Sequence, residues 1–438
     1  MKNIAIIGYG KQGVAAYEYW KQKSASITVC DRNSDLNLPQ DVKRKLGENY
    51  LNNLLAYDLI VRSPSVHPRD LVAANSEKIL EKVTTVTDEF LRICPTKNVI
   101  GVTGTKGKGT TSTLIAKMLE ADGQQVHLGG NIGTPPLDLL KNDIQATDYV
   151  VLELANFQLI DVKHSPHIAV CLMVVPEHLD WHPTVEEYYQ SKSQLFRWQT
   201  TEDIAIYFAH NPESVRIASN GKGKKLPYME LPGTVIEKGN FVIDNEIIFS
   251  TNKLKLLGKH NWENVSAAIT AFWQYTHNTE AISSVLSTFS GLEHRLECVR
   301  ELDGISFYDD SFGTTPETAM VALEAFSEPK VIILGGSDKG ASYTELAKTV
   351  ANSNVRCVVL IGNQASRIKE ALTTIGYHNT IGGGETMQSI VKTAYQTAKT
   401  GDIILLSTAC ASFDMFKNYI DRGDQFKTAV QSLVSTAR

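Results

Sequence analysis

Asn98-Val-Ile-Gly-Val-Thr-Gly-Thr-Lys-Gly-Lys-Gly-Thr-Thr111 begins as a short apolar run and continues as a glycine-rich turn that leads into a helix. Gly104 and Gly107 allow backbone N–H groups to approach a polyphosphate closely, and Lys108 adds a cation near the β- and γ-phosphates. A threonine hydroxyl of the pair 110–111 can bind Mg²⁺. The stretch therefore predicts a strand, a phosphate loop and a helix that bind a nucleoside triphosphate. A glycine-rich turn without a ligand is the alternative.

The loop departs from the general phosphate-loop pattern, in which a glycine, four further residues and Gly-Lys-Ser/Thr follow one another. Val102 occupies the first glycine position and Gly109 follows the lysine, so we expect a narrower family. The helix after the loop is predicted over 111–120. A neighbouring strand predicted over 148–153 ends in Glu153, and an acid at this place holds Mg²⁺ in phosphate-loop folds. An ordinary strand-end glutamate is the alternative.

The size and composition of the chain indicate a protein of several domains. Its 438 residues suggest about three domains, and its net charge of −5 and pI of about 6.1 argue against a general nucleic-acid binder. The six cysteines are scattered without a Cys-x-x-Cys pair, which favours buried thiols in a reducing compartment. The apolar run at the start is too short for a signal peptide, and no run approaches the roughly 18 residues that span a bilayer. We therefore expect a soluble cytoplasmic protein without a nucleic-acid or membrane partner.

The first residues carry a second nucleotide-binding pattern. A predicted strand over 3–7 leads into Gly8-Tyr-Gly-Lys-Gln-Gly13 and a helix, and a second strand over 27–30 ends at Asp31. This is the spacing of the Rossmann fingerprint, in which a helix N-terminus receives a phosphate and an acidic residue follows about 20 positions later. Three interpretations stay open: a nucleotide other than a dinucleotide, which we favour, NAD or FAD, and a structural turn.

The predicted fold class is α/β with three domains. Predicted strands over 331–334, 355–361 and 403–406 are separated by helical stretches, which is typical of a doubly wound sheet. The predicted domains are a Rossmann-like domain at 1–92, a central phosphate-loop ATPase-type α/β domain at 93–294, and a Rossmann-like doubly wound domain at 295–438.

Several motifs together resemble those of the Mur ligases, the ATP-dependent amide-forming enzymes of peptidoglycan synthesis. The match runs over essentially the whole chain and keeps the order of the family's motifs. These motifs lie at 104–108, 129–133, 153–159, 177–180, 260–264, 294–295, 309–311 and 335–336. The run 407–418, followed by 421–424, is the most specific and resembles the branch that adds D-glutamate.

The resemblance implies an ADP-forming acid–amino-acid ligase that uses ATP and two Mg²⁺ ions in the cytoplasm. ATP would phosphorylate the free carboxylate of UDP-N-acetylmuramoyl-L-alanine, and the amine of D-glutamate would attack the acyl phosphate. A carboxylate is a poor electrophile, so the protein's task is to position groups and neutralise charge while phosphate is transferred and lost. The N-terminal domain would bind the UDP of the substrate, and we expect a monomer.

The resemblance also assigns catalytic roles in the central domain. Lys108 would contact the transferred phosphoryl group, and Thr110 with Glu153 would hold one Mg²⁺. His178 corresponds to a ligand of the second ion and Lys192 to a lysine that becomes an anionic ligand by carbamylation. A structural histidine and an unmodified surface lysine are the alternatives. The predicted ATP-binding set is Gly104, Thr105, Lys106, Gly107, Lys108, Gly109, Thr110, Thr111, Asn261, Asn264, Arg295 and Asp310.

Two further sets of residues follow from the resemblance. The residues expected near the UDP-substrate are Gly10, Lys11, Gln12, Asp31, Ser63 and Asn131. The residues expected at the amino acid are Thr314, Lys339, Ser412, Tyr419 and Arg422. A dicarboxylate needs a cation and hydroxyl or N–H donors at both ends, and Lys339 suits that need. A solvated loop lysine is the alternative.

Three departures from the family pattern leave the amino acid open. Phe312 stands where the family has lysine, Ala155-Asn156 where two serines are common, and 108–110 is closer to folylpolyglutamate synthases. A ligase that uses L-glutamate, D-aspartate or a folate acceptor is the nearest alternative, although the N-terminal nucleotide fold argues against the folate branch. An NAD(P)-dependent oxidoreductase and a nucleotide-dependent binding subunit without activity also stay open as interpretations.

Overall fold

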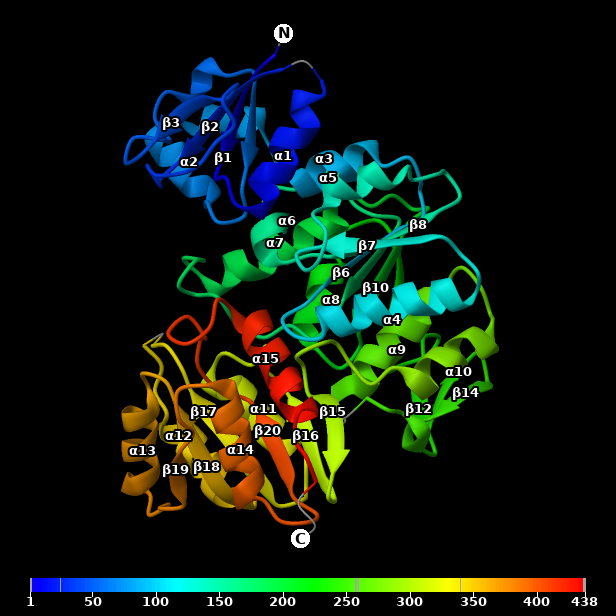
Figure 1. Cartoon of the computed structure of the whole chain (residues 1–438). Helices are drawn as coiled ribbons and strands as arrows, with labels where there is room; N and C mark the ends of the chain where they lie inside the picture. Colours follow the sequence, from blue (N-terminus) through cyan, green and yellow to red (C-terminus); the bar gives the residue numbers. More distant parts are fainter. Residues whose placement is uncertain (1, 24, 257, 259, 339, 436–438) are drawn as a thin grey trace. The chain divides into compact units, whose positions relative to one another are not determined.

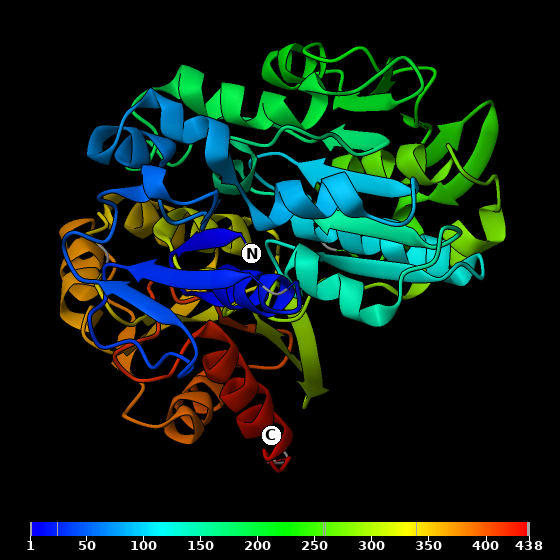
Figure 2. The same ribbon diagram turned by 90° about the horizontal axis from the view of Figure 1, so that it is seen from above.

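The computed structural model describes residues 2–435 apart from residues 24, 257, 259 and 339. Two compact units make up the chain: one contains Met1–Leu254 and Lys259–Thr288, the other Lys255–Gly258 and Phe289–Arg438. Helices lie on both sides of the strands within each unit (Figure 1 and Figure 2). Among the described residues, no helix is both long enough and apolar enough to cross a bilayer.

A five-stranded parallel sheet opens the first unit, with strand order β3-β2-β1-β4-β5. Its strands are β1 (Asn3–Ile7), β2 (Ser26–Asp31), β3 (Lys43–Leu46), β4 (Leu59–Arg62) and β5 (Val83–Thr84), and its helices are α1 (Lys11–Lys21), α2 (Pro68–Ala74) and α3 (Val86–Ile93). Successive side chains point to opposite faces of a strand. Ile4 and Ile6 therefore share a core with α1 and α3, whereas Ala5 and Ile7 share one with α2. The sheet is doubly wound, as the N-terminal pattern predicts.

The second sheet of this unit has six parallel strands in the order β11-β10-β9-β6-β8-β7. The strands are β6 (Val99–Thr103), β7 (Val126–Gly130), β8 (Tyr149–Glu153), β9 (Ile168–Cys171), β10 (Ile204–Phe208) and β11 (Lys224–Tyr228). The helices are α4 (Lys108–Ala121), α5 (Pro136–Leu139), α6 (Asn156–Leu159), α7 (Val185–Arg197), α8 (Pro212–Ala218), α9 (His260–Phe272) and α10 (Thr279–Thr288). A small antiparallel sheet is made by β12 (Val235–Glu237), β13 (Asn240–Ile243) and β14 (Glu246–Ser250). Since β6, β8 and β9 are parallel neighbours, the loops that follow them all start at the carboxyl ends of the strands, on the same side of the sheet.

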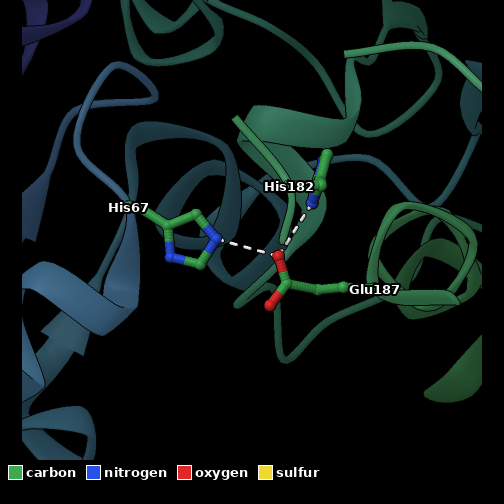
Figure 3. A group of neighbouring side chains, drawn as sticks. All are labelled: His67, His182 and Glu187. Carbon is green, nitrogen blue, oxygen red and sulfur yellow. Dashed lines mark hydrogen bonds and ion pairs between the residues drawn. The ribbon is translucent and has the colours of Figure 1, made fainter. Parts of the chain in front are cut away.

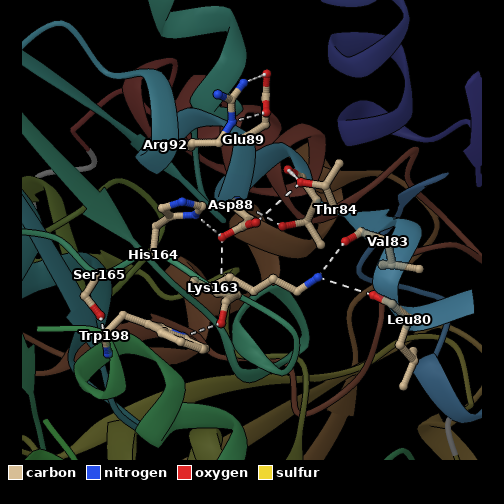
Figure 4. Close-up of polar contacts among 12 residues, drawn as sticks. Leu80, Val83, Thr84, Asp88, Glu89, Arg92, Lys163, His164, Ser165 and Trp198 are labelled. Atoms are coloured by element: carbon tan, nitrogen blue, oxygen red, sulfur yellow. Dashed lines mark hydrogen bonds and ion pairs between the residues drawn. The ribbon is translucent and has the colours of Figure 1, made fainter. Parts of the chain in front are cut away.

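Polar contacts join α3 to the loop before β9 within the first unit (Figure 4). The buried carboxylate of Asp88 accepts hydrogen bonds from the backbone nitrogen of Lys163 at 2.7 Å and from Nδ1 of His164 at 2.8 Å. The ammonium group of Lys163 donates to the backbone oxygens of Leu80 and Val83, both at 3.3 Å. These bonds hold the last segment of the first sheet against the second sheet.

The second unit is built on one six-stranded sheet of order β15-β16-β20-β17-β18-β19, in which only the β15–β16 pair is antiparallel. The strands are β15 (Glu297–Leu302), β16 (Ile305–Asp309), β17 (Lys330–Gly335), β18 (Val355–Ile361), β19 (Thr380–Gly382) and β20 (Ile403–Leu406). The helices are α11 (Pro316–Glu324), α12 (Thr344–Asn352), α13 (Ala365–Thr374), α14 (Met387–Thr397) and α15 (Tyr419–Gln431). Helices α11, α12 and α13 share a core on one face of the sheet, and α14 and α15 share a core on the other.

The predicted α/β class is confirmed, and the strands predicted over 331–334, 355–361 and 403–406 correspond to β17, β18 and β20. One helix boundary is wrong: α4 begins at Lys108, three residues before the predicted start. The reason is the left-handed backbone of Gly107, which caps the helix and places the end of the glycine-rich loop in its first turn. The three-domain division remains a prediction.

Candidate active site

The phosphate loop connects β6 to α4 and depends on two glycines. Gly104 has a φ of 149° and Gly107 a φ of 86°, both in the left-handed region. A Cβ atom on Gly104 would lie 2.7 Å from Cβ of Leu172, and one on Gly107 would lie 2.0 Å from Oδ1 of Asn264. Both positions therefore require glycine. Because the first N–H groups of a helix have no intrahelical partner, the loop has the form of an anion site.

Two lysine side chains converge on the carbonyl groups of this loop. The ammonium nitrogen of Lys108 donates to the oxygen of Gly104 at 3.1 Å and to that of Thr105 at 2.9 Å. The ammonium nitrogen of Lys192 donates to the same Gly104 oxygen at 2.9 Å. Lys108 thus brings a positive charge to the predicted position of the polyphosphate, and the side-chain nitrogen of Lys192 lies beside it.

The remaining predicted ATP-binding residues of the first unit surround the loop. Lys106 is exposed and forms an ion pair of 2.7 Å with Glu177. Oγ1 of Thr111 lies 3.5 Å from Oδ1 of Asn264, whose Nδ2 donates to Oδ1 of Asn261 at 2.8 Å. These contacts hold the start of α9 against α4, beside the loop.

Glu153 ends β8, the neighbour of the strand that carries the loop, and only 3% of its surface is exposed. Its Oε1 accepts a hydrogen bond from Nδ2 of Asn131 at 3.2 Å, whereas its Oε2 is buried and has no hydrogen-bond partner in the described part of the chain. A buried carboxylate oxygen without a partner fits a ligand of Mg²⁺, which prefers oxygen. Gly109 and Thr110 lie on the first turn of α4, which follows the adjacent strand β6 through the phosphate loop.

His178 lies in the turn after β9 with a left-handed φ of 59°. Its ring packs against Phe157 with 4.8 Å between centroids, and its Nε2 is 3.5 Å from a carboxylate oxygen of Glu177. Burial lowers the pKa of His178 below its usual 6.5, against the opposing charges of Glu177 and Asp180. The imidazole is therefore neutral at pH 7 and offers a lone pair to a metal ion or a proton.

Lys192 lies on α7 and is 1% exposed, so the alternative of a surface lysine is wrong. Its ammonium nitrogen lies 4.6 Å from the ring centroid of Tyr188, one turn earlier. The pKa of Lys192 is lowered to about 7, mainly by burial and next by the positive charge of Lys108. A large fraction of this side chain is the neutral amine near neutral pH.

At the first sheet, the predicted UDP residues gather where β1 ends and α1 begins. Gly10 is the N-cap of α1, and the Asp31 carboxylate accepts the backbone N–H of Tyr9 at 2.8 Å. A Cβ atom on Gly8 would lie 2.8 Å from Cβ of Ser63, so the turns after β1 and β4 touch. The arrangement has the strand–turn–helix form that receives a phosphate in Rossmann-like folds, and UDP binding at this turn stays a prediction.

Lys11 and Gln12 reach from α1 to the loop after β7. The ammonium nitrogen of Lys11 donates to the oxygen of Gly133 at 2.5 Å, and Nε2 of Gln12 lies 3.4 Å from the oxygen of Gly130. Oε1 of Gln12 is buried without a hydrogen-bond partner in the part of the chain that is described. The backbone nitrogen of Asn131 donates to the oxygen of Glu153 at 2.7 Å, which links this loop to the predicted metal carboxylate.

In the second unit, Arg295 stacks on the aromatic residue that replaces the expected lysine. Its guanidinium carbon lies 3.7 Å from the ring centroid of Phe312, whose edge meets the ring of Tyr419 at 5.2 Å. Asp310 accepts a hydrogen bond of 2.6 Å from Ser407, and burial raises the pKa of Asp310 to about 7. A nearly buried carboxyl group near its pKa can donate or accept a hydrogen bond.

Arg422 is fully buried and braces two loops of the second unit. Its guanidinium group donates to Oγ and the backbone oxygen of Ser311 at 2.9 and 2.8 Å and to the backbone oxygen of Cys410 at 3.1 Å. Thr314 and Ser412 follow on the same two loops, after β16 and β20. In this structure Arg422 therefore holds the loops that carry the predicted amino-acid residues.

The predicted site residues fall on both units. Arg295, Asp310 and the amino-acid set belong to the second unit, and the other predicted residues belong to the first. Lys339 lies outside the described residues, so its contact with the amino acid remains a prediction.

Three side chains of the first unit form a group that the sequence did not predict: His67 and His182 each hydrogen-bond to Glu187, which the sequence indicates only as a helix-capping residue three positions after Thr184. The four-residue spacing of His178 and His182 is a signal that a search for paired histidines would have found. His67 and Glu187 are 120 residues apart, and no local pattern connects them.

The first unit has a phosphate loop at the carboxyl end of β6, a buried carboxylate beside the loop, and a second, Rossmann-like sheet. These features define a nucleotide-binding α/β protein of the phosphate-loop class. Family models match three stretches: the MurD-like N-terminal domain of Mur ligases over 2–81, the Mur ligase middle domain over 102–272, and the Mur ligase, glutamate ligase domain over 294–410. The chain belongs to the Mur ligase family. The predicted family and the predicted ligase class are confirmed.

Curated relatives extend this similarity to nearly the full chain. The UDP-N-acetylmuramoylalanine–D-glutamate ligase of Acetivibrio thermocellus is 35% identical over 458 residues, which cover 99% of this chain and 97% of the relative. The protein of the same name from Symbiobacterium thermophilum is 36% identical over 453 residues, with 99% and 98% covered.

Solved structures of the family share the fold. The UDP-N-acetylmuramate–alanine ligase MurC of Thermotoga maritima matches with a TM-score of 0.60 at 16% identity, covering 99% of this chain and 100% of that one. The MurF ligase of Thermotoga maritima in complex with ADP matches with a TM-score of 0.59 at 17% identity, covering 98% and 95%.

Proposed function

We propose that the chain is an ATP-dependent ligase that joins D-glutamate to UDP-N-acetylmuramoyl-L-alanine in peptidoglycan precursor synthesis, with release of ADP and phosphate. The observation that supports this most is the identity of 32% to 36% over 99% of the chain with relatives of that name. The glycine-dependent phosphate loop and the buried, unpartnered oxygen of Glu153 support the nucleotide and metal part of the proposal.

The first chemical step is phosphoryl transfer at the phosphate loop. A carboxylate oxygen of the UDP-substrate attacks the γ-phosphorus of ATP, and the bond from that phosphorus to the β–γ bridging oxygen breaks. The N–H groups at the start of α4 and the ammonium group of Lys108 stabilise the charge on the transferred group. Lys108 exchanges its contacts with Gly104 and Thr105 for phosphate oxygens in this step.

The side chains beside the loop fit Mg²⁺. Glu153, through its buried Oε2, and Thr110 would hold one ion, and His178 with a carbamate on Lys192 would hold a second. Bound Mg²⁺ supplies positive charge that polarises the phosphate oxygens. The lowered pKa of His178 keeps its imidazole in the unprotonated form that a metal requires.

The carbamate on Lys192 is proposed from its burial and its pKa of about 7. The neutral amine attacks the carbon of CO₂, a C–N bond forms, one C=O bond becomes a C–O⁻ group, and the nitrogen loses a proton. The product is an anion, whereas an ammonium group at this place would repel Mg²⁺.

The second chemical step forms the amide. The amino nitrogen of D-glutamate, as the neutral amine, attacks the carbonyl carbon of the acyl phosphate. The C–O bond to phosphate breaks, and the nitrogen loses a proton, which leaves with the phosphate as hydrogen phosphate. We place the amino acid at Thr314, Lys339, Ser412 and Tyr419, with the buried Arg422 holding the loops that bear two of these residues.

The UDP part of the substrate is placed at Gly10, Lys11, Gln12, Asp31, Ser63 and Asn131. The ammonium group of Lys11 and the buried amide of Gln12 support this placement, because a diphosphate needs a cation and polar partners. We assign residues 1–92, 93–294 and 295–438 to the UDP-substrate, ATP and amino-acid domains, and we propose a cytoplasmic monomer.

One observation favours a second candidate, a ligase of the same reaction type with another acidic amino acid such as L-glutamate or D-aspartate. Phe312 replaces the lysine that the family pattern leads us to expect, and Arg295 stacks on its ring at 3.7 Å. The cation nearest this ring is therefore carried on a different side chain, which changes where a carboxylate can bind.

The test is ADP release by the purified chain with ATP, Mg²⁺ and UDP-N-acetylmuramoyl-L-alanine, with D-glutamate, L-glutamate and D-aspartate supplied separately. We expect turnover with D-glutamate that depends on all four components and is lost in Lys108→Ala. Turnover with L-glutamate or D-aspartate alone would move the assignment to the second candidate. Release of ADP without the UDP-substrate, or none with any amino acid, would overturn the ligase proposal.

A further inference from the structure

His67, Glu187 and His182 form a hydrogen-bonded bridge (Figure 3). It connects the start of α2 to the turn of His178, whose backbone oxygen accepts the N–H of His182. Oε1 of Glu187, on the first turn of α7, lies 2.9 Å from Nε2 of His67 and 2.9 Å from Nδ1 of His182. The two imidazole rings are 5% and 0% exposed, whereas the Glu187 side chain is 30% exposed. One carboxylate oxygen thus receives two buried N–H groups from segments far apart in the sequence.

The other ring nitrogens determine which tautomer each histidine adopts. Nδ1 of His67 accepts the backbone N–H of Arg69 at 3.1 Å, and Nε2 of His182 lies 2.7 Å from Nδ2 of Asn156. A nitrogen that accepts a hydrogen bond carries no proton in a neutral ring. His67 therefore donates through Nε2 and His182 through Nδ1, and both protons point at Glu187.

Two histidines and a glutamate are also a donor set for zinc, and the backbone of Arg69 argues against that use. A histidine that binds a metal through Nε2 keeps its proton on Nδ1 and donates it to an acceptor. For His67 that proton would meet the backbone N–H of Arg69, which cannot accept it. The group fits two neutral histidines that donate to a carboxylate.

The bridge ends at a strained turn. The backbone nitrogens of Trp181 and His182 both donate to the oxygen of His178, at 3.1 and 2.9 Å, and His178 has a φ of 59°. A non-glycine residue in this region persists only where its surroundings hold it. The ring of His67 provides part of that support, because it packs on Trp181 with 4.2 Å between centroids.

We propose that Glu187 is a positioning residue: through His182 it fixes the turn of His178, and through His67 it couples this turn to the segment that begins at Ser63. The inference rests on the proposed function, which places His178 at the metal site and Ser63 at the UDP-substrate. Placement of His178 then depends on a contact with the UDP-binding fold. Glu187 makes its hydrogen bonds to His67 and His182, so it acts on His178 only through other residues.

The test compares Glu187→Gln with Glu187→Met by the release of ADP in the presence of all four components. Glutamine keeps an oxygen that can accept both N–H groups, and the side chain is 30% exposed, so water can solvate its amide. Glu187→Gln is expected to keep turnover close to that of the wild type. Methionine has no such acceptor, and Glu187→Met is expected to lower kcat by about 10- to 100-fold, the usual effect of removing an outer hydrogen bond at a metal site. KM for ATP should change much less.

Glu186→Met is the matched control. Glu186 lies on the same helical turn, but it is exposed and pairs with Arg216 at 2.9 Å. It should leave kcat unchanged. Equal activity of Glu187→Met and Glu186→Met would overturn the inference, and so would a loss in Glu187→Gln as large as in Glu187→Met, because that would show a need for charge. An inactive wild type would instead overturn the proposed function.

A measurement without turnover keeps the inference open to refutation if Glu187→Met does not fold. Nitrogen-15 NMR of the histidine side chains in the wild-type chain should show a protonated Nε2 on His67 and a protonated Nδ1 on His182. Signals for the opposite tautomers, for two imidazolium rings, or a shift of both rings on addition of Zn²⁺ would each overturn it.

Discussion

At the residue scale, Phe312 departs from the family pattern and Lys192 keeps to it. Phe312 stands where lysine is expected, and its ring packs against Arg295 and Tyr419. Lys192, in contrast, is the residue that the family pattern leads us to expect. Its burial lowers its pKa to about 7, which makes carbamylation feasible. In both cases the neighbours of the side chain determine its chemistry.

Phe312→Lys is expected to lower activity, because it removes the aromatic face below Arg295 and adds a like charge beside it. A cation–π contact is worth about 0.5–2 kcal/mol, depending on solvent exposure. The measurement is kcat/KM for the amino acid, with Phe312→Tyr as the control that keeps a ring. Unchanged or higher activity of Phe312→Lys would show that the ring does not support Arg295.

At the scale of elements, β6, the phosphate loop and α4 form a strand–loop–helix unit whose shape is set by its glycines and by packing. Its geometry follows from the left-handed backbone of Gly104 and Gly107 and from the contact of α4 with α9. The approach of Asn264 to Gly107 leaves no room for a side chain. The loop therefore depends on a residue of α9 that is far away in the sequence.

Gly107→Ala is expected to abolish ATP binding, and Gly123→Ala is the matched control. Both glycines have nearly the same φ, 86° and 84°, so both variants carry the same left-handed strain, about 1–2 kcal/mol. A Cβ atom at 107 would lie 2.0 Å from Oδ1 of Asn264, whereas at 123 nothing lies within 4 Å. Calorimetric titration with ATP should separate them; equal affinities would show that the loop can move away from Asn264.

At the scale of the whole molecule, the two sheets of the first unit are joined by buried polar groups. Arg62 is fully buried at the end of β4, and its guanidinium group donates to both carboxylate oxygens of Asp161 at 2.6 Å. It also donates to the backbone oxygen of Phe157 at 3.0 Å. Together with the contacts of Asp88 and Glu187, this pair holds the two parallel sheets within one compact unit.

Arg62→Met is expected to destabilise the first unit by about 3–5 kcal/mol, because it leaves the partly buried carboxylate of Asp161 without its partner. The double variant Arg62→Met/Asp161→Leu should recover part of that loss. Arg216→Met, which removes the solvent-accessible ion pairs with Glu186 and Glu213, should cost about 0–1 kcal/mol. Denaturant unfolding measures all three. Similar midpoints for Arg62→Met and Arg216→Met would contradict the proposed role of the buried pair.

Local patterns made the fold class and the two glycine-rich strand–turn–helix units predictable. The glycines of the phosphate loop and of the first turn encode backbone shapes that few other residues can adopt, so their spacing alone identifies them. Alternating apolar strands and helices likewise indicated the doubly wound sheets. The start of α4 was misplaced by three residues because the helix cap depends on the backbone of Gly107.

The contacts that shape the site were decided only in three dimensions. The bridge of His67, Glu187 and His182 spans 120 residues, the burial of Lys192 depends on the packing of α7, and the stack of Arg295 on Phe312 forms where two loops meet. A local pattern constrains backbone dihedral angles, whereas hydrogen bonds, burial and pKa shifts depend on which distant groups the folded chain brings into contact.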